Sequence, residues 1–285
     1  MSLPGNVVVI GAGTMGNGIA QTFATAGVQT VLLDIKDEFV ERGIGAIGKS
    51  LARFVKKEKM TAAQVEEIQG RIRGSTSFDS VRDANLVVEA VTERVEVKTD
   101  VFRRIDEVAP AETILASNTS SISITLLGAQ TGRADRVIGM HFMNPVPLMV
   151  LVEVIRGQDT SDATTQTVMS CAEALGKTPV EANDYPGFVS NRVLMPMINE
   201  AAYCLMEGVS SREGIDQIMK LGMNHPLGPL ALADLIGLDV CVEILDVLKN
   251  GLGDDKYRAC PLLRRMVAAG HLGRKTGRGF YEYDR

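Results

Sequence analysis

The stretch NVVVIGAGTMG, residues 6–16, decides the fold expected for this chain. Residues 7–10 form a continuous apolar run, as in a strand that is covered on both faces, and a GxGxxG pattern follows. Gly11 permits a tight turn, Gly13 lets the backbone approach a pyrophosphate, and Gly16 lets the next helix pack closely on the strand. The N-terminus of that helix offers free N–H groups to phosphates. The stretch predicts a dinucleotide site, with a glycine-rich turn in an unrelated α/β protein as the alternative.

A helix and a second strand follow this turn in the order that a dinucleotide site requires. Residues 19–24 carry apolar side chains at helical spacing, and residues 31–33 form a second apolar run that ends in Asp34. Asp34 is placed to accept hydrogen bonds from an adenosine ribose, and its charge would repel a 2′-phosphate, which favours NAD over NADP. Lys36, which lies nearby, weakens that preference. The expected cofactor residues of this segment are Gly11, Gly13, Thr14, Met15, Gly16 and Asp34.

Later apolar runs continue the alternation of strands and helices, and polar residues follow the ends of these runs. Residues 86–91 precede Glu93 and Lys98, and residues 113–116 precede the small polar run 117–121. In a doubly wound sheet the carboxyl ends of the strands face the ligand crevice. Glu93, Lys98 and a hydroxyl group of residues 117–121 are therefore candidate contacts, with helix-start charges and helix capping as the alternatives. The fold class expected is α/β, with a doubly wound, mostly parallel Rossmann-type sheet.

The stretch VIGMHFMNPVPLMVLVEVI, residues 137–155, is expected to form a strand, a loop and a returning strand. His141 ends the first run, at a carboxyl end of the sheet, and Glu153 lies inside the second. A carboxylate in an apolar run is costly to bury without a partner. Glu153 would fix the tautomer of the imidazole while His141 moves a proton. A buried ion pair without chemistry is the alternative, but the shared position of the candidate residues at the carboxyl ends favours catalysis.

Residues 37–75 interrupt the alternation and are expected to form a helical hairpin that projects from the sheet. Apolar side chains recur at helical spacing in its first half, and Thr61 with Gln64 has the pattern of a capping box that opens a second helix. Its basic side chains form either a solvated helix face or a landing site for a polyanionic ligand. These basic residues are Lys49, Arg53, Lys56, Lys57 and Lys59.

The character of the sequence changes near residue 186, beyond which the β-branched runs stop. Helical patterns replace them, including one that Ser210 and Glu213 would open as a capping box and one that spans residues 230–248. The expected organisation is therefore an NAD-binding domain over residues 1–185 and an all-helical domain over residues 186–285. The apolar stripes of the second domain predict either a helical core or, in part, a dimer face.

Composition limits the possible classes of function. The 285 residues carry a net charge of −5, which disfavours nucleic acid as the main partner. The four cysteines form no CxxC pair and no zinc-ligand spacing, so we expect no metal site and reduced cysteines in a cytoplasmic protein. Glycines interrupt the apolar start, and no run approaches the length of a membrane span, so neither a signal peptide nor a membrane partner is expected.

Several motifs in order over the whole length resemble the L-3-hydroxyacyl-CoA dehydrogenases, within them the short bacterial 3-hydroxybutyryl-CoA dehydrogenases. The resemblance implies hydride transfer between NAD and an (S)-3-hydroxyacyl-CoA, with 3-hydroxybutyryl-CoA as the expected substrate and a 3-ketoacyl-CoA as the product. It also implies a homodimer that forms through the helical domain. The motifs are GAGTMG at 11–16, SNTSS at 117–121, HFMNPVP at 141–147, LVEVI at 151–155, DYPGFVSNR at 184–192 and GRKTGRGFYEY at 273–283.

The resemblance also implies roles at the matching positions. His141 would be the general base and Glu153 its partner. Ser120 and Asn191 would hydrogen-bond the reacting oxygen and hold the acyl group, and Asn144 would line the same pocket. The implied NAD contacts are Asp34, Glu93, Lys98, Ser120 and Asn144, and the implied coenzyme A contacts are Ser50 and Lys57.

One residue departs from the family pattern, and two other functions remain possible. Val150 stands where many relatives carry Lys, at a position that bears on the pocket mouth. A related dehydrogenase could act on a free hydroxy acid or a sugar acid, although such a substrate has no use for the lysine-rich hairpin. A non-catalytic NAD-binding structural dimer is the alternative from another class.

Overall fold

The computed structural model describes residues 3–284, and the chain divides into two compact units between Tyr185 and Pro186. The first unit is built on one eight-stranded sheet in the order β3-β2-β1-β4-β5-β6-β7-β8. Neighbouring strands are parallel except for the antiparallel pair β6 and β7. The strands are β1 (Asn6–Ile10), β2 (Gln29–Leu33), β3 (Ile72–Ser75), β4 (Leu86–Glu89), β5 (Ile114–Ser117), β6 (Val137–Phe142), β7 (Leu151–Arg156) and β8 (Thr178–Asn183).

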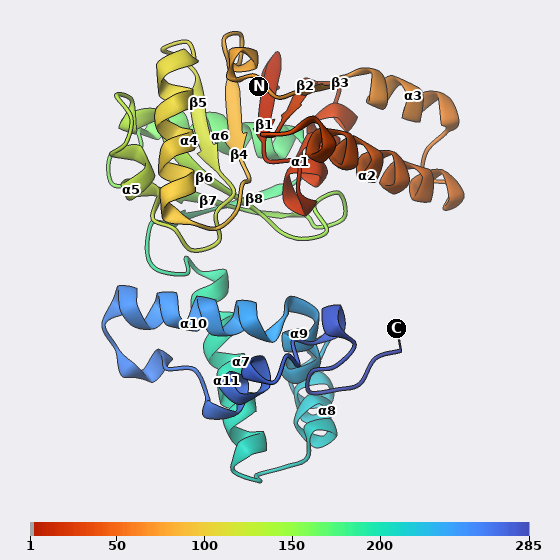
Figure 1. Ribbon diagram of the computed structural model, residues 1–285, viewed down its shortest axis with the longest axis vertical. Helices are drawn as coiled ribbons and strands as arrows, with labels where there is room; N and C mark the ends of the chain where they lie inside the picture. The colour runs from red at the N-terminus through yellow and green to blue at the C-terminus, as the bar shows by residue number, and fades with distance from the viewer. Residues whose placement is uncertain (1–2, 285) are drawn as a thin grey trace. The chain divides into compact units, whose positions relative to one another are not determined.

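The central strands are apolar on both faces because helices cover both faces of the sheet. In β1, Val7, Val8 and Val9 are all buried. Helices α1 and α6 pack against one face and share a single hydrophobic core, whereas α4 and α5 lie on the other face (Figure 1). The predicted doubly wound, mostly parallel sheet is confirmed. The helices of this unit are α1 (Thr14–Thr25), α2 (Asp37–Lys56), α3 (Ala62–Gly70), α4 (Val95–Val108), α5 (Ile124–Gly128) and α6 (Asp162–Ala174), with 3₁₀ turns η1 (Phe78–Val81) and η2 (Ala134–Arg136).

Helices α2 and α3 form the projecting hairpin, which extends beyond the edge of the sheet (Figure 1). The capping box is present: the Thr61 hydroxyl accepts from the Gln64 backbone N–H, and the Gln64 side chain accepts from the Thr61 N–H. The hairpin ends earlier than expected. Ile72–Ser75 forms the edge strand β3, parallel to β2, because the short segment after α3 finds backbone partners there.

The second unit is helical, and its core is a separate cluster of buried apolar side chains. The helix expected over residues 230–248 is two helices, because Gly237 has a φ of 108° and interrupts the helical hydrogen bonding. The expected cap at Ser210 was wrong by one residue, since the Ser211 hydroxyl accepts from the Gly214 N–H. The helices are α7 (Ser190–Met206), α8 (Arg212–Gly222), α9 (Pro229–Ile236), α10 (Leu238–Leu252) and α11 (Pro261–Ala268), with 3₁₀ turns η3 (Asp255–Tyr257) and η4 (Arg274–Thr276).

No helix within residues 3–284 combines the length and the apolar character that crossing a membrane would require.

Candidate active site

The glycine turn between β1 and α1 requires its glycines for different physical reasons. Gly11 has a φ of 103°, and a Cβ there would lie 2.5 Å from the Ala90 carbonyl oxygen. A Cβ on Gly16 would lie 1.7 Å from the Gly11 carbonyl oxygen, so the start of α1 packs directly on the turn. A Cβ on Gly13 would lie in open space, with no neighbouring group of residues 3–284 within 4 Å. The turn therefore leaves room for a ligand at Gly13 and for nothing at Gly16.

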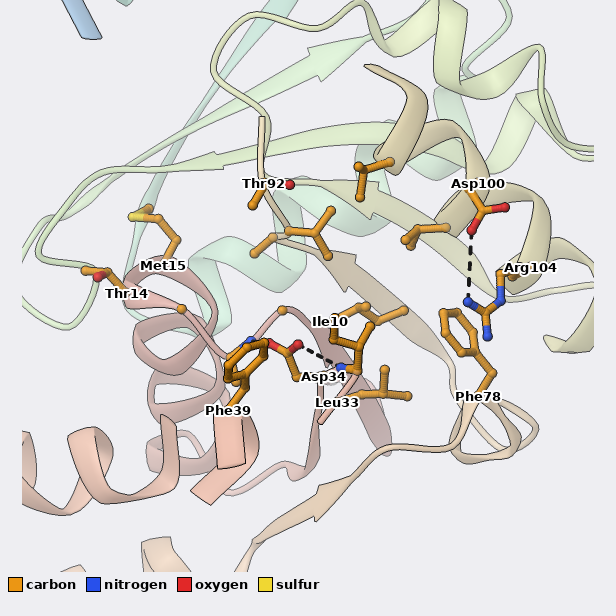
Figure 2. Close-up of a pocket in the computed structure, with 18 of the residues that line it drawn as sticks. Ile10, Thr14, Met15, Leu33, Asp34, Phe39, Phe78, Thr92, Asp100 and Arg104 are labelled. Atoms are coloured by element: carbon orange, nitrogen blue, oxygen red, sulfur yellow. Dashed lines mark hydrogen bonds and ion pairs between the residues drawn. The ribbon is translucent and has the colours of Figure 1, made fainter. Parts of the chain in front are cut away.

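A cleft of about 520 Å³ opens at this turn, within the usual size range of ligand pockets. Asp34 lies at the end of β2, and its Oδ2 accepts a 2.7 Å hydrogen bond from the Ala12 N–H (Figure 2). Its Oδ1 accepts from the Ile35 N–H. These bonds aim a carboxylate into the cleft, where it can also accept hydrogen bonds from ribose hydroxyls. Of the cofactor residues expected in this segment, the cleft is lined by Gly11, Gly13, Thr14, Met15 and Asp34.

Two aromatic rings, neither of which the sequence reasoning identified, also line this cleft. Phe39 carries the Arg42 guanidinium over its ring at 5.0 Å, and Phe78 carries that of Arg104 at 3.9 Å. Figure 2 shows both rings beside the cleft, on either side of the Asp34 strand end. Their flat faces suit a planar base. A single phenylalanine after a strand carries no sequence signal for such a role, because its position depends on the fold.

His141 and Glu153, the predicted pair, lie directly opposite each other in the antiparallel strands β6 and β7. Nδ1 of His141 is 2.8 Å from Oε2 of Glu153, and both side chains are buried. Because a carboxylate only accepts hydrogen bonds, Nδ1 carries the ring proton and donates a hydrogen bond to Glu153. The other ring nitrogen, Nε2, is then the basic atom of the imidazole. It lies 3.1 Å from the Ser120 hydroxyl oxygen.

Ser120 is held at the histidine by a carboxylate. Glu93 Oε1 accepts from the Thr119 hydroxyl at 2.5 Å and from the backbone N–H groups of Ser120 and Ser121 at 2.9 and 3.1 Å. Burial alone would raise the pKa of Glu93, but the Lys98 ammonium and these hydrogen bonds outweigh it and place the pKa below its usual value. The carboxylate is therefore ionised throughout the neutral pH range and anchors the loop after β5.

Lys98, expected as a cofactor contact, is 1% exposed, and its Nζ lies 2.6 Å from Oε1 of Glu89 and 3.3 Å from Oε2 of Glu93. Glu89 is a residue of this region that the sequence reasoning missed. It is a carboxylate inside the apolar run of β4, the same signal that identified Glu153. Glu93, Lys98, Ser120 and Asn144 do not line the cleft of the glycine turn, and their contact with a cofactor stays a prediction.

The loop between β6 and β7 is held by a lysine that precedes β8. Asn144 follows β6 in an exposed position, and its peptide bond to Pro145 is cis. The Lys177 ammonium donates to the carbonyl oxygens of Val146 and Met149 at 2.6 and 2.7 Å. Burial lowers the pKa of Lys177.

Three further predicted site residues lie elsewhere in the fold. Ser50 is half-buried on α2, and Lys57 is exposed at the C-terminal end of that helix. Asn191 is buried in the second unit, near the start of α7. Residues 3–284 contain no group of three or more His, Cys, Asp or Glu side chains that could hold a metal ion.

Comparison with known proteins gives the same assignment to both units. Residues 6–185 match the 3-hydroxyacyl-CoA dehydrogenase NAD binding domain, and residues 187–283 match the 3-hydroxyacyl-CoA dehydrogenase C-terminal domain. A Bacillus subtilis protein named "Probable 3-hydroxybutyryl-CoA dehydrogenase" is 56% identical over 98% of this chain and 97% of its own length.

Two further relatives carry the same activity in their names. The 3-hydroxybutyryl-CoA dehydrogenase of Clostridioides difficile is 49% identical over 98% of this chain and 99% of its own. The crystal structure of (S)-3-hydroxybutyryl-CoA dehydrogenase from Ralstonia eutropha superposes with a TM-score of 0.96, at 52% identity, over 99% of this chain and 100% of its own. The chain therefore belongs to the 3-hydroxyacyl-CoA dehydrogenase family, with an NAD-binding first unit.

Proposed function

We propose that this protein interconverts (S)-3-hydroxyacyl-CoA and 3-ketoacyl-CoA with NAD as the redox partner, and that 3-hydroxybutyryl-CoA is its substrate. The observation that carries the proposal is the hydrogen-bonded series Glu153, His141 and Ser120, with Nε2 of the histidine 3.1 Å from the serine hydroxyl. A base whose tautomer is fixed by a buried carboxylate, next to a hydroxyl group, suits proton removal from an alcohol.

In the oxidative direction, Nε2 of His141 takes the proton of the 3-hydroxyl group. The imidazolium that forms carries a proton on both nitrogens, and the buried Glu153 carboxylate 2.8 Å from Nδ1 stabilises its charge. Ser120 orients the reacting oxygen by a hydrogen bond, and in the reverse direction the imidazolium returns the proton to that oxygen. General acid–base help of this kind is worth roughly 10²–10⁴-fold in rate. Asn144 and Asn191 are further proposed contacts of the substrate.

The residues of the glycine turn fit an NAD molecule. The open space at Gly13 and the first N–H groups of α1 suit the pyrophosphate, and Asp34 suits the adenosine ribose. A bound NAD would provide the acceptor for the hydride that leaves C3 of the substrate, and NADH would provide the donor in the reverse direction. Glu93 and Lys98, which support the Ser120 loop, are the proposed contacts on the nicotinamide side.

The basic face of the projecting hairpin is the proposed landing site for the phosphates of coenzyme A. The five basic side chains are exposed, and none of them pairs with a carboxylate within residues 3–284. An unpaired cation cluster on a protein of net charge −5 attracts a polyanion locally. The cluster consists of Lys49, Arg53, Lys56, Lys57 and Lys59, with Ser50 on the same helix.

We expect Lys57→Glu to raise the KM for acetoacetyl-CoA by about 3- to 10-fold, with kcat nearly unchanged, because reversing one exposed charge removes an attraction and adds a repulsion. The effect should shrink as ionic strength rises. Steady-state kinetics at low and high salt measure both. The control is Arg136→Glu, which makes the same change of charge just before the amino end of β6. This position is away from the carboxyl ends of the strands, so the variant should leave KM unchanged. Equal effects of the two variants would contradict a specific coenzyme A site.

We also propose a homodimer that forms through the helical unit, in the cytoplasm. That unit exposes large apolar side chains, among them Val193, Val209 and Leu221. All four cysteines are free thiols. Burial raises the pKa of the Cys171 thiol to about 11 and, together with nearby carboxylates, that of Cys241 to about 12, so both stay protonated at neutral pH. Sedimentation at micromolar concentration measures the oligomeric state directly.

The test of the proposed function is a set of initial rates with NADH and NADPH against three oxidants: acetoacetyl-CoA, a medium-chain 3-ketoacyl-CoA and free acetoacetate. We expect the highest kcat/KM with acetoacetyl-CoA and NADH. A preference for free acetoacetate would instead support a dehydrogenase of free hydroxy acids. Complete absence of NADH oxidation with every acyl-CoA would support a non-catalytic NAD-binding protein.

A further inference from the structure

The proton-transfer steps above leave one buried carboxylate of the crevice unused. Glu89 ends β4, with Ile10 of β1 on one side in register and Ser117 of β5 on the other. Its side chain is fully buried, in a segment whose other members are apolar. Such a position is costly for a charge unless the charge is paired and all of its oxygens are bonded.

Every oxygen of Glu89 has a partner. Oε1 accepts from the Lys98 ammonium at 2.6 Å and from the Val91 N–H at 2.7 Å, and Oε2 accepts from the Ser117 hydroxyl at 2.6 Å. The Ser117 hydroxyl oxygen in turn accepts from the Thr119 N–H at 3.2 Å. Glu89 therefore connects the carboxyl ends of β4 and β5 to helix α4.

Lys98 links Glu89 to a second carboxylate, Glu93. Its Nζ is shared between the two carboxylates, at 2.6 Å from Glu89 and 3.3 Å from Glu93, and it also donates to the Val91 carbonyl oxygen at 3.3 Å. With one cation between two carboxylates, the position of the more exposed one, Glu93, depends on the buried one. Without Glu89, the buried Lys98 ammonium would lose its nearest carboxylate and keep only Glu93 at 3.3 Å.

The series ends at the reacting groups. Glu93 binds the Thr119 hydroxyl and the N–H groups of Ser120 and Ser121, and the Ser120 hydroxyl lies 3.1 Å from Nε2 of His141. Each link is a direct hydrogen bond or ion pair. Misplacing a reacting group by about 1 Å can cost on the order of 10²-fold in rate.

We propose that Glu89 and Lys98 form a buried positioning pair that sets the place of the Ser120 hydroxyl against His141 by holding Glu93. The pair acts through other residues and does not itself touch the substrate oxygen. The role in turnover rests on the proposed dehydrogenase function, whereas the effect on the His141 ring does not.

The first test is the variant Glu89→Gln, which keeps the shape and removes the charge. We expect kcat for acetoacetyl-CoA to fall by about 10- to 100-fold, with its KM changed by less than about 3-fold, because the proposed coenzyme A contacts lie on the hairpin and not on β4.

The double variant Glu89→Gln with Lys98→Met removes both charges. We expect it to unfold at a higher temperature than Glu89→Gln, since the buried ammonium that lost its nearest carboxylate is also removed, yet to keep the low kcat because Glu93 has lost its cation.

The matched control is Thr113→Val, directly before the amino end of the neighbouring strand β5 and so far from the carboxyl ends. The Thr113 hydroxyl is fully buried and donates to the Ala84 carbonyl oxygen at 2.6 Å, so this variant also loses a buried hydrogen bond. We expect it to lower the unfolding temperature while kcat stays within about 2-fold of the unmodified protein. A kcat that recovers in the double variant together with its stability would overturn the proposal and leave Glu89 a purely structural residue.

A readout that needs no turnover separates this inference from the proposed function. The chain has three histidines, so the ring nitrogen resonances of His141 can be assigned by comparison with His141→Gln. We expect the Nε2 resonance to move in Glu89→Gln and in the double variant, because the Ser120 hydrogen bond changes, and to stay in place in Thr113→Val. An unmoved Nε2 resonance in Glu89→Gln would overturn the proposal even if the protein is an active dehydrogenase. A moved resonance supports it even if acetoacetyl-CoA is not reduced.

Discussion

His141→Gln is expected to lower kcat for acetoacetyl-CoA reduction by about 10²- to 10⁴-fold, the typical contribution of a general acid or base. Glutamine can still donate a hydrogen bond to Glu153, but it can neither take up nor release a proton near neutral pH. The affinity for NADH should change little, because the glycine turn and Asp34 lie in a separate part of the crevice. Steady-state rates and a fluorescence titration with NADH measure the two quantities.

Two companion variants separate chemistry from folding. His271→Gln makes the same substitution in the second unit, outside the proposed catalytic residues, and should retain the normal kcat. Glu153→Gln should lower kcat by about 10- to 10³-fold, because the imidazolium loses its buried counter-charge while the base remains. If His141→Gln lowered the unfolding temperature but turned over normally, the His141–Glu153 pair would be a structural ion pair without a catalytic role.

The sequence was sufficient to predict those parts of the site where a physical requirement restricts a position to one type of residue. The glycine spacing and the terminal Asp34 predicted the cofactor turn, and β-branched runs predicted most of the sheet. Glu153 was found because a carboxylate in an apolar strand requires a partner, and His141 is that partner in the next strand. The roles of these residues in turnover stay predictions until the variants are measured.

The same signal was present at Glu89 and was missed, because its partner Lys98 lies on a helix and not on a neighbouring strand. A sequence does not show that the Lys98 ammonium turns inward to a buried carboxylate, so this lysine at a helix start was interpreted only as a candidate cofactor contact. The break at Gly237 was missed for a related reason. The apolar pattern continues across this residue, and only its positive φ separates α9 from α10.

The second large effect is expected at Gly16. A Cβ there would lie 1.7 Å from the Gly11 carbonyl oxygen, which is a backbone atom, so no side-chain rotation can relieve the overlap. Gly16→Ala must therefore shift the whole turn. We expect a loss of roughly 2–4 kcal/mol in the free energy of unfolding, as for overpacked or strained core positions. We also expect NADH affinity to weaken by at least about 100-fold, since the N–H groups that would face the pyrophosphate move with the turn.

Gly13→Ala should separate these two effects, because the same added methyl group meets different surroundings. Gly13 has a φ of −67°, which alanine adopts easily, and a Cβ there would face open space in the described part of the chain. We expect unfolding free energy to stay within about 1 kcal/mol of the unmodified value, while NADH affinity falls by about 10-fold or more because the methyl group fills the approach of the pyrophosphate. Gly45→Ala, at an open position inside helix α2, is the control that should leave NADH affinity unchanged and raise the unfolding free energy by no more than about 1 kcal/mol, because alanine favours a helix interior. Denaturant titration and NADH fluorescence test all three variants, and normal NADH binding by Gly13→Ala would mean that the dinucleotide does not approach this turn.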